Sequence, residues 1–239
     1  MNKKSPHKQI LVLFLLAVSA CMFPHVPGVF ASEANCSSRQ KICFQWTFIA
    51  NLNQGKKLSA INFDENNVLR SGDQLKTSFT LYKPCFLYFI HHGPGDDVSL
   101  IHPPSIPQEP PSAAMPATYN IPENNQWFAL DDNAGKETFY LVAASMRLNG
   151  LESLLMDYNR SDASEKVEIG KKIIHKVQQF NQKSAKLTAA AERPVKIGGT
   201  VRGGVGRDCP GNSIPLDTFD SLMVSANDFY IKVITIDHK

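Results

Sequence analysis

The sequence predicts an all-β sandwich, for which an immunoglobulin-like form is one option, with an α-helical insertion. Short runs rich in aromatic and β-branched residues recur along the chain, and Gly, Pro, Asn and Asp separate them. One stretch after Arg147 changes to the apolar spacing of a helix. Hydrophobic residues make up 43% and charged residues 20% of the chain, which is typical of a protein that folds around a core.

The first residues have the pattern of an export signal. Residues 1–8 are cationic and residues 10–20 are uninterruptedly apolar, which is too short a run to span a bilayer. Cleavage after Ala31 would make residues 1–31 the signal peptide and Ser32 the first mature residue. Alternatively Cys21 follows a lipoprotein-like sequence, so that residues 1–20 would be removed and Cys21 lipidated. We expect a periplasmic or cell-envelope location, with an outer-membrane lipoprotein as the alternative.

The charge balance argues against two classes of partner, nucleic acid and an acidic membrane surface. Lys3, Lys4 and Lys8 account for the whole excess of 25 basic over 22 acidic residues, so the mature chain is neutral. A neutral chain without a basic stripe gives no electrostatic basis for binding nucleic acid. We expect contact with a membrane only through a lipid anchor.

Four cysteines remain after either processing route. Cys36, Cys43, Cys85 and Cys209 form an even set, and outside the cytoplasm this predicts two disulfides. The sequence does not distinguish the three possible connectivities.

Residues 40–147 are predicted to form the β-sandwich core. A first strand begins at Cys43, residues 74–82 and 85–92 are interpreted as a hairpin, and residues 93–97 form a turn before a strand that ends at Pro103. The proline-rich residues 103–116 are predicted to be an exposed loop and a candidate binding surface. Short extended pieces at 117–122 and 126–130 and a buried strand at 137–145 complete this region.

Residues 148–193 are predicted to be the helical insertion. A short helix is followed by a longer amphipathic one, which begins with a capping pattern at Asp162 and Glu165 and whose apolar stripe reaches Leu187 before Pro194 ends it. Residues 194–239 are expected to complete the β domain. They comprise a glycine-rich loop at 198–206, which lacks the spacing of a phosphate-binding loop, and a final strand.

The best candidates for chemistry are His91, His92, Asp96, Asp97 and His102, because imidazoles and carboxylates can bind a metal or exchange protons. Neighbouring His91 and His92 should point to opposite faces of a strand, and the aspartates lie in a turn where they ordinarily bond to the backbone. The GxSxG motif of a serine hydrolase and the sequence context of a thiol protease are both missing. We therefore expect no catalytic residue, metal or cofactor, and keep a metal-dependent hydrolase using His91, His92 and His102 as an alternative.

The middle of the chain resembles a bacterial family known as domain of unknown function 4384. The shared features are a GD pair, an aromatic-rich strand, a strand-ending proline, a Y-x-I-P sequence and a G-x-E strand. They fall here at Gly72 and Asp73, residues 86–89, Pro103, residues 119–122, and Gly135 with Glu137. Two departures are His102, where the family has an aromatic residue, and a longer segment at 157–193.

The resemblance implies fold more than function, because its motifs are structural and provide no catalytic residue. The family is found in exported proteins and beside serine/threonine kinase or caspase-like domains, which implies an accessory or sensory role in the envelope. We expect an exported, non-catalytic binding or interaction module whose partner is a protein or envelope component. An accessory subunit of an envelope signalling or secretion complex is a further alternative.

Overall fold

The computed structural model describes residues 36, 38–52, 57–106, 109, 114–186, 190–195 and 219–239, all within the unit Ala34–Lys239. Four predicted features lie outside these residues: the signal segment with Cys21, the cleavage site at Ala31 and Ser32, Cys209, and the glycine-rich loop. Within the described part of the chain, no helix is both long and apolar enough to span a membrane.

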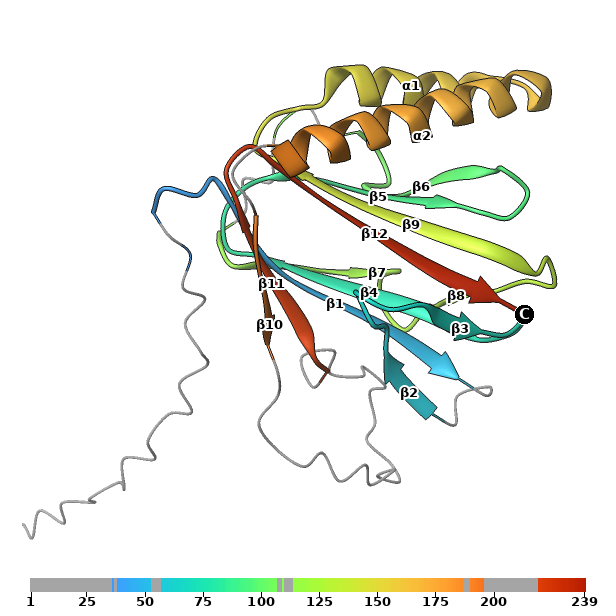
Figure 1. Ribbon diagram of the computed structural model, residues 1–239, viewed down its shortest axis with the longest axis horizontal. Coiled ribbons are helices and arrows are strands. Elements are labelled where there is room, and N and C mark those ends of the chain that lie inside the picture. The colour runs from blue at the N-terminus through green and yellow to red at the C-terminus, as the bar shows by residue number, and fades with distance from the viewer. Residues whose placement is uncertain are drawn as a thin grey trace, which may run out of the picture. The chain divides into compact units, whose positions relative to one another are not determined.

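The described chain contains two sheets and two helices (Figure 1). In chain order the elements are β1 (Ile42–Leu52), β2 (Lys57–Ala60), β3 (Asn67–Leu69), β4 (Gln74–Leu81), β5 (Phe86–His92), β6 (Val98–His102), β7 (Ala117–Ile121), β8 (Phe128–Ala129), β9 (Gly135–Ala144), α1 (Asn149–Arg160), α2 (Ala163–Lys186), β10 (Ala191–Val195), β11 (Ser221–Ala226) and β12 (Phe229–His238). The seven-stranded sheet has the order β10-β11-β1-β4-β7, with β2 paired to β1 and β8 to β4. The five-stranded sheet has the order β3-β12-β9-β5-β6. The predicted β-sandwich with a helical insertion is confirmed.

The two sheets pack face to face around large aromatic side chains. Trp46 of β1 is fully buried, and its ring centroid lies 4.6 Å from that of Phe63, 5.7 Å from Phe79 of β4 and 6.2 Å from Phe89 of β5. The indole nitrogen donates a hydrogen bond of 2.7 Å to the hydroxyl of Thr77, so no polar group of this ring is left unpaired. Burying each such ring contributes on the order of 2–3 kcal/mol.

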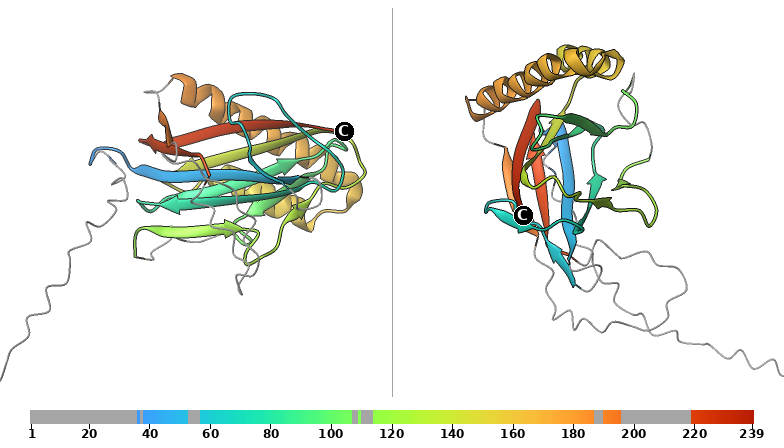
Figure 2. Two further views of the ribbon diagram at one scale, coloured as in Figure 1. Left: turned by 90° about the horizontal axis from the view of Figure 1, so that it is seen from below. Right: turned by 90° about the vertical axis from the view of Figure 1, so that its right-hand side faces the viewer.

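A second core lies between the outer face of the five-stranded sheet and the two helices, which cover this face in both views (Figure 2). Alternate residues of β5 and β9 point outward into it, while the residues between them point into the first core. Its buried members are Phe86, Tyr88, Ile90, Val98, Tyr140, Val142, Leu151, Leu155, Ile173, Val177 and Ile231. The unit Ala34–Lys239 therefore has three layers, and the apolar stripe of α2 packs against the sheet, with Ile173 and Val177 buried and Ile169 and Phe180 partly buried.

A buried carboxylate connects the helical layer to the sheet. Glu152 of α1 is 1% exposed and accepts a hydrogen bond of 2.6 Å from the hydroxyl of Tyr88 on β5. The guanidinium of Arg147 donates to its other oxygen, with Nε at 2.9 Å. Burial and the bond to Glu152 raise the pKa of Tyr88. A buried charge is tolerated here because both oxygens are hydrogen-bonded.

The predicted start of the long helix is confirmed. The carboxylate of Asp162 accepts hydrogen bonds from the backbone amides of Ser164 at 2.9 Å and Glu165 at 3.1 Å, as an N-terminal cap does. Hydrogen bonds from the Ser164 hydroxyl and from these two amides lower the pKa of Asp162.

Two predictions of the pairing and length of elements are wrong. Residues 74–82 and 85–92 are not a hairpin, because β4 pairs with β1 in one sheet whereas β5 pairs with β9 in the other. The apolar pattern of two successive strands is the same whether the chain turns back or crosses to the facing sheet. Pro194 does not simply end a helix: α2 ends at Lys186, and Pro194 lies in β10, an edge strand, where a missing N–H is tolerated.

Besides β10, the strands β2, β3 and β11 were not predicted from sequence. β2 and β11 pair with β1, and β3 pairs with β12, so these strands depend on their partners and their own short sequences carry little signal. The turn at residues 93–97 is confirmed, and it joins β5 to β6 as an antiparallel pair. The proline-rich loop is described only at residues 103–106, 109 and 114–116.

Replacing Tyr88 by Phe removes one hydrogen bond from the buried Glu152 carboxylate while keeping the ring. We expect Tyr88→Phe to lower the free energy of unfolding by about 1.5–3 kcal/mol, the range for a hydrogen bond to a charged group. Urea unfolding followed by circular dichroism measures this.

Tyr82→Phe is the matched control, because the Tyr82 hydroxyl donates to a neutral acceptor, the side-chain oxygen of Gln45, at 3.1 Å and is only partly buried. Its expected loss is about 0.5–1.5 kcal/mol. Equal losses in the two variants would contradict a special contribution from Glu152.

Candidate functional site

A cavity of about 280 Å³ lies between the two sheets beside the β5–β6 turn. One wall is apolar and comes from both sheets, including Leu75 of β4, Phe128 of β8 and Phe139 of β9. Polar side chains line the rest, among them His91 of β5 and Glu137 of β9. An apolar recess with a few converging polar groups is the usual form of a small-ligand site.

The turn at residues 93–97 closes one side of this cavity. It is held by a hydrogen bond of 3.0 Å from the amide of Gly93 to the carbonyl of Asp97. Gly135 begins β9 with φ +155°, and a Cβ atom there would lie 2.4 Å from the Cβ of Pro94. Only glycine therefore lets the turn pack against the start of β9. This packing puts Asp97 and Glu137 on the same cavity.

Glu137 is the central polar residue of the site. Its side chain is 4% exposed, and one carboxylate oxygen lies 2.6 Å from His91 Nε2 while the other lies 3.1 Å from His238 Nδ1. His238 in turn places Nε2 3.1 Å from the hydroxyl oxygen of Ser71. The four side chains form a continuous hydrogen-bonded chain from the cavity to the exposed turn at Ser71.

The orientation of the protons follows from these contacts. An ionised carboxylate only accepts hydrogen bonds, so His91 Nε2 and His238 Nδ1 both act as donors toward Glu137. When His238 is neutral, its Nε2 therefore carries the lone pair and accepts the hydroxyl proton of Ser71. The arrangement offers the Ser71 hydroxyl a base.

The predicted candidates are separated by the structure rather than gathered. His91 and His92 point to opposite faces, as expected: His91 lines the cavity, whereas His92 lies 3.2 Å from Asp96 and faces α2. His102 packs against the ring of Tyr119 with centroids 5.7 Å apart. The hypothesis that His91, His92 and His102 form one metal centre is therefore not supported by their placement. Among the described residues there is no group of three or more His, Cys, Asp or Glu side chains able to hold a metal.

The cysteine prediction needs correction at Cys85. Cys36 and Cys43 form a disulfide that ties the segment before β1 to the start of this strand. Cys85 instead carries a free thiol that is fully buried in the core between the sheets. Burial raises the pKa of Cys85 to about 12, so the thiol stays protonated and unreactive at neutral pH. The state of Cys209 lies outside the described residues.

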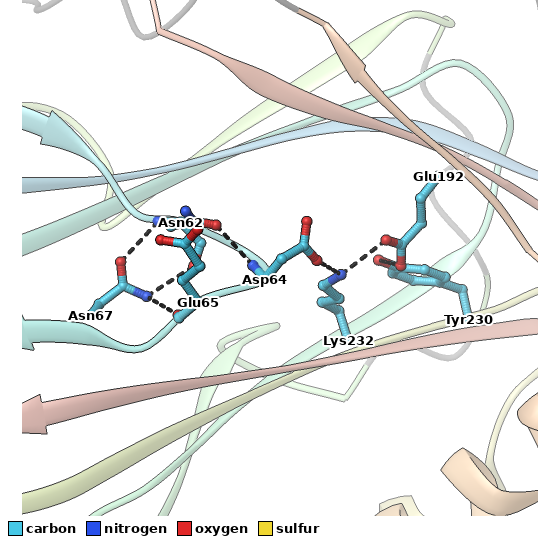
Figure 3. Close-up of polar contacts among 7 residues, drawn as sticks. All are labelled: Asn62, Asp64, Glu65, Asn67, Glu192, Tyr230 and Lys232. Atoms are coloured by element: carbon cyan, nitrogen blue, oxygen red, sulfur yellow. Dashed lines mark hydrogen bonds and ion pairs between the residues drawn. The ribbon is translucent and has the colours of Figure 1, made fainter.

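A second polar cluster connects β12 to β10 and to the segment between β2 and β3 (Figure 3). Lys232 of β12 donates hydrogen bonds of 2.9 Å to Asp64 and to Glu192 of β10, and the buried hydroxyl of Tyr230 donates to Glu192 at 2.8 Å. Burial by itself lowers the pKa of Lys232, but its hydrogen bonds to these two carboxylates and their negative charge outweigh burial and raise the pKa. The cluster holds β10 and the β2–β3 connection onto β12, which is a structural role.

Comparison with known proteins identifies the part of the chain that contains the cavity. Residues 68–147 match the family model for the Domain of unknown function (DUF4384). The match covers less than half of the chain and confirms the resemblance expected from the motifs. It runs from β3 to β9 and includes His91, Glu137 and Ser71, whereas His238 lies outside it. No curated protein and no solved structure matches the chain.

Sequence reasoning missed the three residues that connect to His91. Glu137 enters the sequence analysis only as part of the G-x-E motif of the DUF4384 family, and Ser71, which precedes Gly72, belongs to no motif. His238 lies 101 residues after Glu137 and 167 after Ser71, so no local pattern relates them. The one available signal was that Glu137 begins a strand predicted to be buried, since buried charges are paired.

His102 gives a pH-dependent contribution to stability. Burial lowers the pKa of His102 to about 4 from an ordinary value of 6.5. Between these values the unfolded chain binds a proton that the folded chain does not, so this contribution is lost as the pH falls from 6.5 toward 4. We expect the free energy of unfolding of the wild type to fall more than that of His102→Phe over this range, by about 2 kcal/mol.

Urea unfolding of both proteins at pH 7 and at pH 4.5 measures this difference. The Phe variant keeps a ring against Tyr119 and restores the aromatic residue of the DUF4384 family. The same loss of stability in both proteins would show that another group titrates.

Proposed function

We propose that this chain is an exported binding module of the bacterial envelope and that its ligand occupies the cavity between the two sheets. The observation that carries the proposal is the cavity itself, which has an apolar wall from both sheets and polar side chains from β5, β9 and the adjacent turns. Its volume of about 280 Å³ lies just below the range of roughly 300–1,000 Å³ for sites that bind drug-sized ligands. A single side chain or a small molecule fits this space.

The polar lining favours a particular chemistry. Asp97, Asp131 and Glu137 are hydrogen-bond acceptors when ionised, and His91 is already directed toward Glu137. A ligand that combines an apolar group with hydrogen-bond donors would satisfy both parts of the cavity. The side chain of a partner protein or a small envelope component can provide this combination.

Export rests on the sequence and is supported by the disulfide. The cationic and apolar residues 1–20 have the order of a signal sequence. The bond between Cys36 and Cys43 is of a kind that persists in oxidising compartments. The DUF4384 resemblance agrees with such a location because that family occurs in exported proteins.

Filling the cavity tests the binding proposal. Ser99 on β6 lines the cavity at an exposed strand position, and we expect Ser99→Trp to reduce recovery of the bound component at least tenfold. The measurement is affinity capture from intact envelopes with the full chain, quantified by mass spectrometry. Asn120→Trp is the matched control, because Asn120 is also an exposed strand residue but does not line the cavity.

Both variants must melt at the wild-type temperature for the comparison to hold. Equal capture by the wild type and both variants would place binding elsewhere, with the loop at residues 103–116 as the next surface to vary. Capture that is lost equally in both variants would mean that binding does not depend on the cavity.

The processing site is tested in the same envelope sample. We expect the mature N-terminus to be an unmodified Ser32, which corresponds to cleavage after Ala31 and to a soluble periplasmic protein. Intact-mass analysis distinguishes this from a chain that begins at an acylated Cys21. The acylated form would instead establish a lipid-anchored protein.

A further inference from the structure

We propose that Ser71 is an activated nucleophile that takes acyl groups from esters, with His238 as its base and Glu137 as the residue that positions His238. Ser71 lies in the turn before β4, His238 near the end of β12 and Glu137 on β9. The hydroxyl oxygen of Ser71 lies 3.1 Å from His238 Nε2, and His238 Nδ1 lies 3.1 Å from Glu137 Oε1. Nucleophile, base and orienting carboxylate are thus in hydrogen-bond contact in the order that serine chemistry needs.

The contacts of Glu137 determine which nitrogen of His238 is the base. Glu137 accepts from His238 on one oxygen and from His91 on the other. With its Nδ1 proton committed to Glu137, neutral His238 presents the Nε2 lone pair to Ser71. This is the tautomer in which an imidazole removes a proton from a serine hydroxyl.

The base and the carboxylate are buried, whereas the nucleophile is exposed. The side chain of His238 is 0% exposed and that of Glu137 is 4% exposed, so neighbouring atoms fix their orientation. Ser71, in contrast, is exposed and open to a reagent. The following residue, Gly72, has φ +85°, which a residue with a side chain rarely adopts, and this shapes the tight turn that presents Ser71.

The reaction is balanced without any further reactant. As the Ser71 oxygen forms a bond to the carbonyl carbon of an ester, its proton moves to His238 Nε2. The bond from that carbon to the alcohol oxygen then breaks, and the leaving alcohol takes the proton from His238. The products are an acylated Ser71 and a free alcohol, and nothing is oxidised or reduced.

The backbone around Ser71 limits the rate of the reaction. The amide of Ser71 donates to the carbonyl of Lys239 at 3.3 Å, and that of Gly72 donates to the carbonyl of Leu130 at 2.9 Å. These two amides are therefore not available to stabilise an oxyanion, which in hydrolases is worth a large part of the rate. Because acylation of Ser71 and hydrolysis of the acyl group both pass through an oxyanion, both steps are expected to be slow.

A fluorophosphonate probe tests the proposal on the full mature chain. The serine oxygen bonds to phosphorus, fluoride leaves, and the product is stable enough for intact-mass analysis and peptide mapping. We expect one adduct per chain, on Ser71, and its loss in Ser71→Ala. Ser59→Ala, which changes a serine whose hydroxyl contacts only a backbone carbonyl at 3.5 Å, should label at the wild-type rate.

Two variants separate activation from folding. His238→Asn can keep a donor toward Glu137 but has no base for Ser71, and we expect its labelling rate to fall at least about a hundredfold. Glu137→Gln removes the negative charge beside the imidazole, and we expect its labelling to reach half the maximal rate at a lower pH than in the wild type. If Glu137 had a purely structural role, the pH at which labelling reaches half its maximal rate would be unchanged in Glu137→Gln.

Circular dichroism and the melting temperature identify the variants that are folded, and only these are compared. If His238→Asn does not fold, Ser71→Ala and the wild-type pH profile still decide the outcome, since labelling must depend on Ser71 and rise with pH. No adduct on the wild type, an adduct on another residue, or an unchanged rate in folded His238→Asn would each overturn the proposal.

Discussion

The five-stranded sheet is buried on both faces, and the rest of the structure follows from this constraint. Its inner face packs on the seven-stranded sheet around Trp46, and its outer face is covered by α1 and α2. Strands β5 and β9 are consequently largely apolar on both sides, so a buried polar group within them must be paired. The Glu137 carboxylate contacts two histidines, and on the outer face the Tyr88 hydroxyl donates to Glu152.

The same constraint explains where the cavity lies. At one end of the sandwich the turn after β5 and the start of β9 pack together through Gly135, and the sheets enclose a space there. A polar chain of contacts runs from this space through Glu137 and His238 to Ser71 at the surface. A binding cavity and a reactive serine would therefore share one carboxylate, so that the occupant of one could influence the other.

Much of the fold could be predicted because it depends on local periodicity. The strands around Trp46, Phe89 and Tyr140, the turn at residues 93–97 and the Asp162 cap all result from side-chain spacing within ten residues. Pairing could not be predicted in the same way. β4 and β5 were expected to form a hairpin, yet they belong to different sheets, and Pro194 was assigned to the end of a helix although it lies in an edge strand.

The sequence by itself determined the export-type pattern at the N-terminus, the equal numbers of basic and acidic residues after residue 31, the β-rich class and the family resemblance of residues 68–147. These properties are carried by composition and by neighbouring residues. Only the tertiary structure decided that His91, Glu137, His238 and Ser71 are in contact, that the three candidate histidines are apart, and that Cys85 is a free thiol. The physical reason is that strand pairing is selected by the burial of whole sheet faces, which brings together residues that are up to 167 positions apart in the chain.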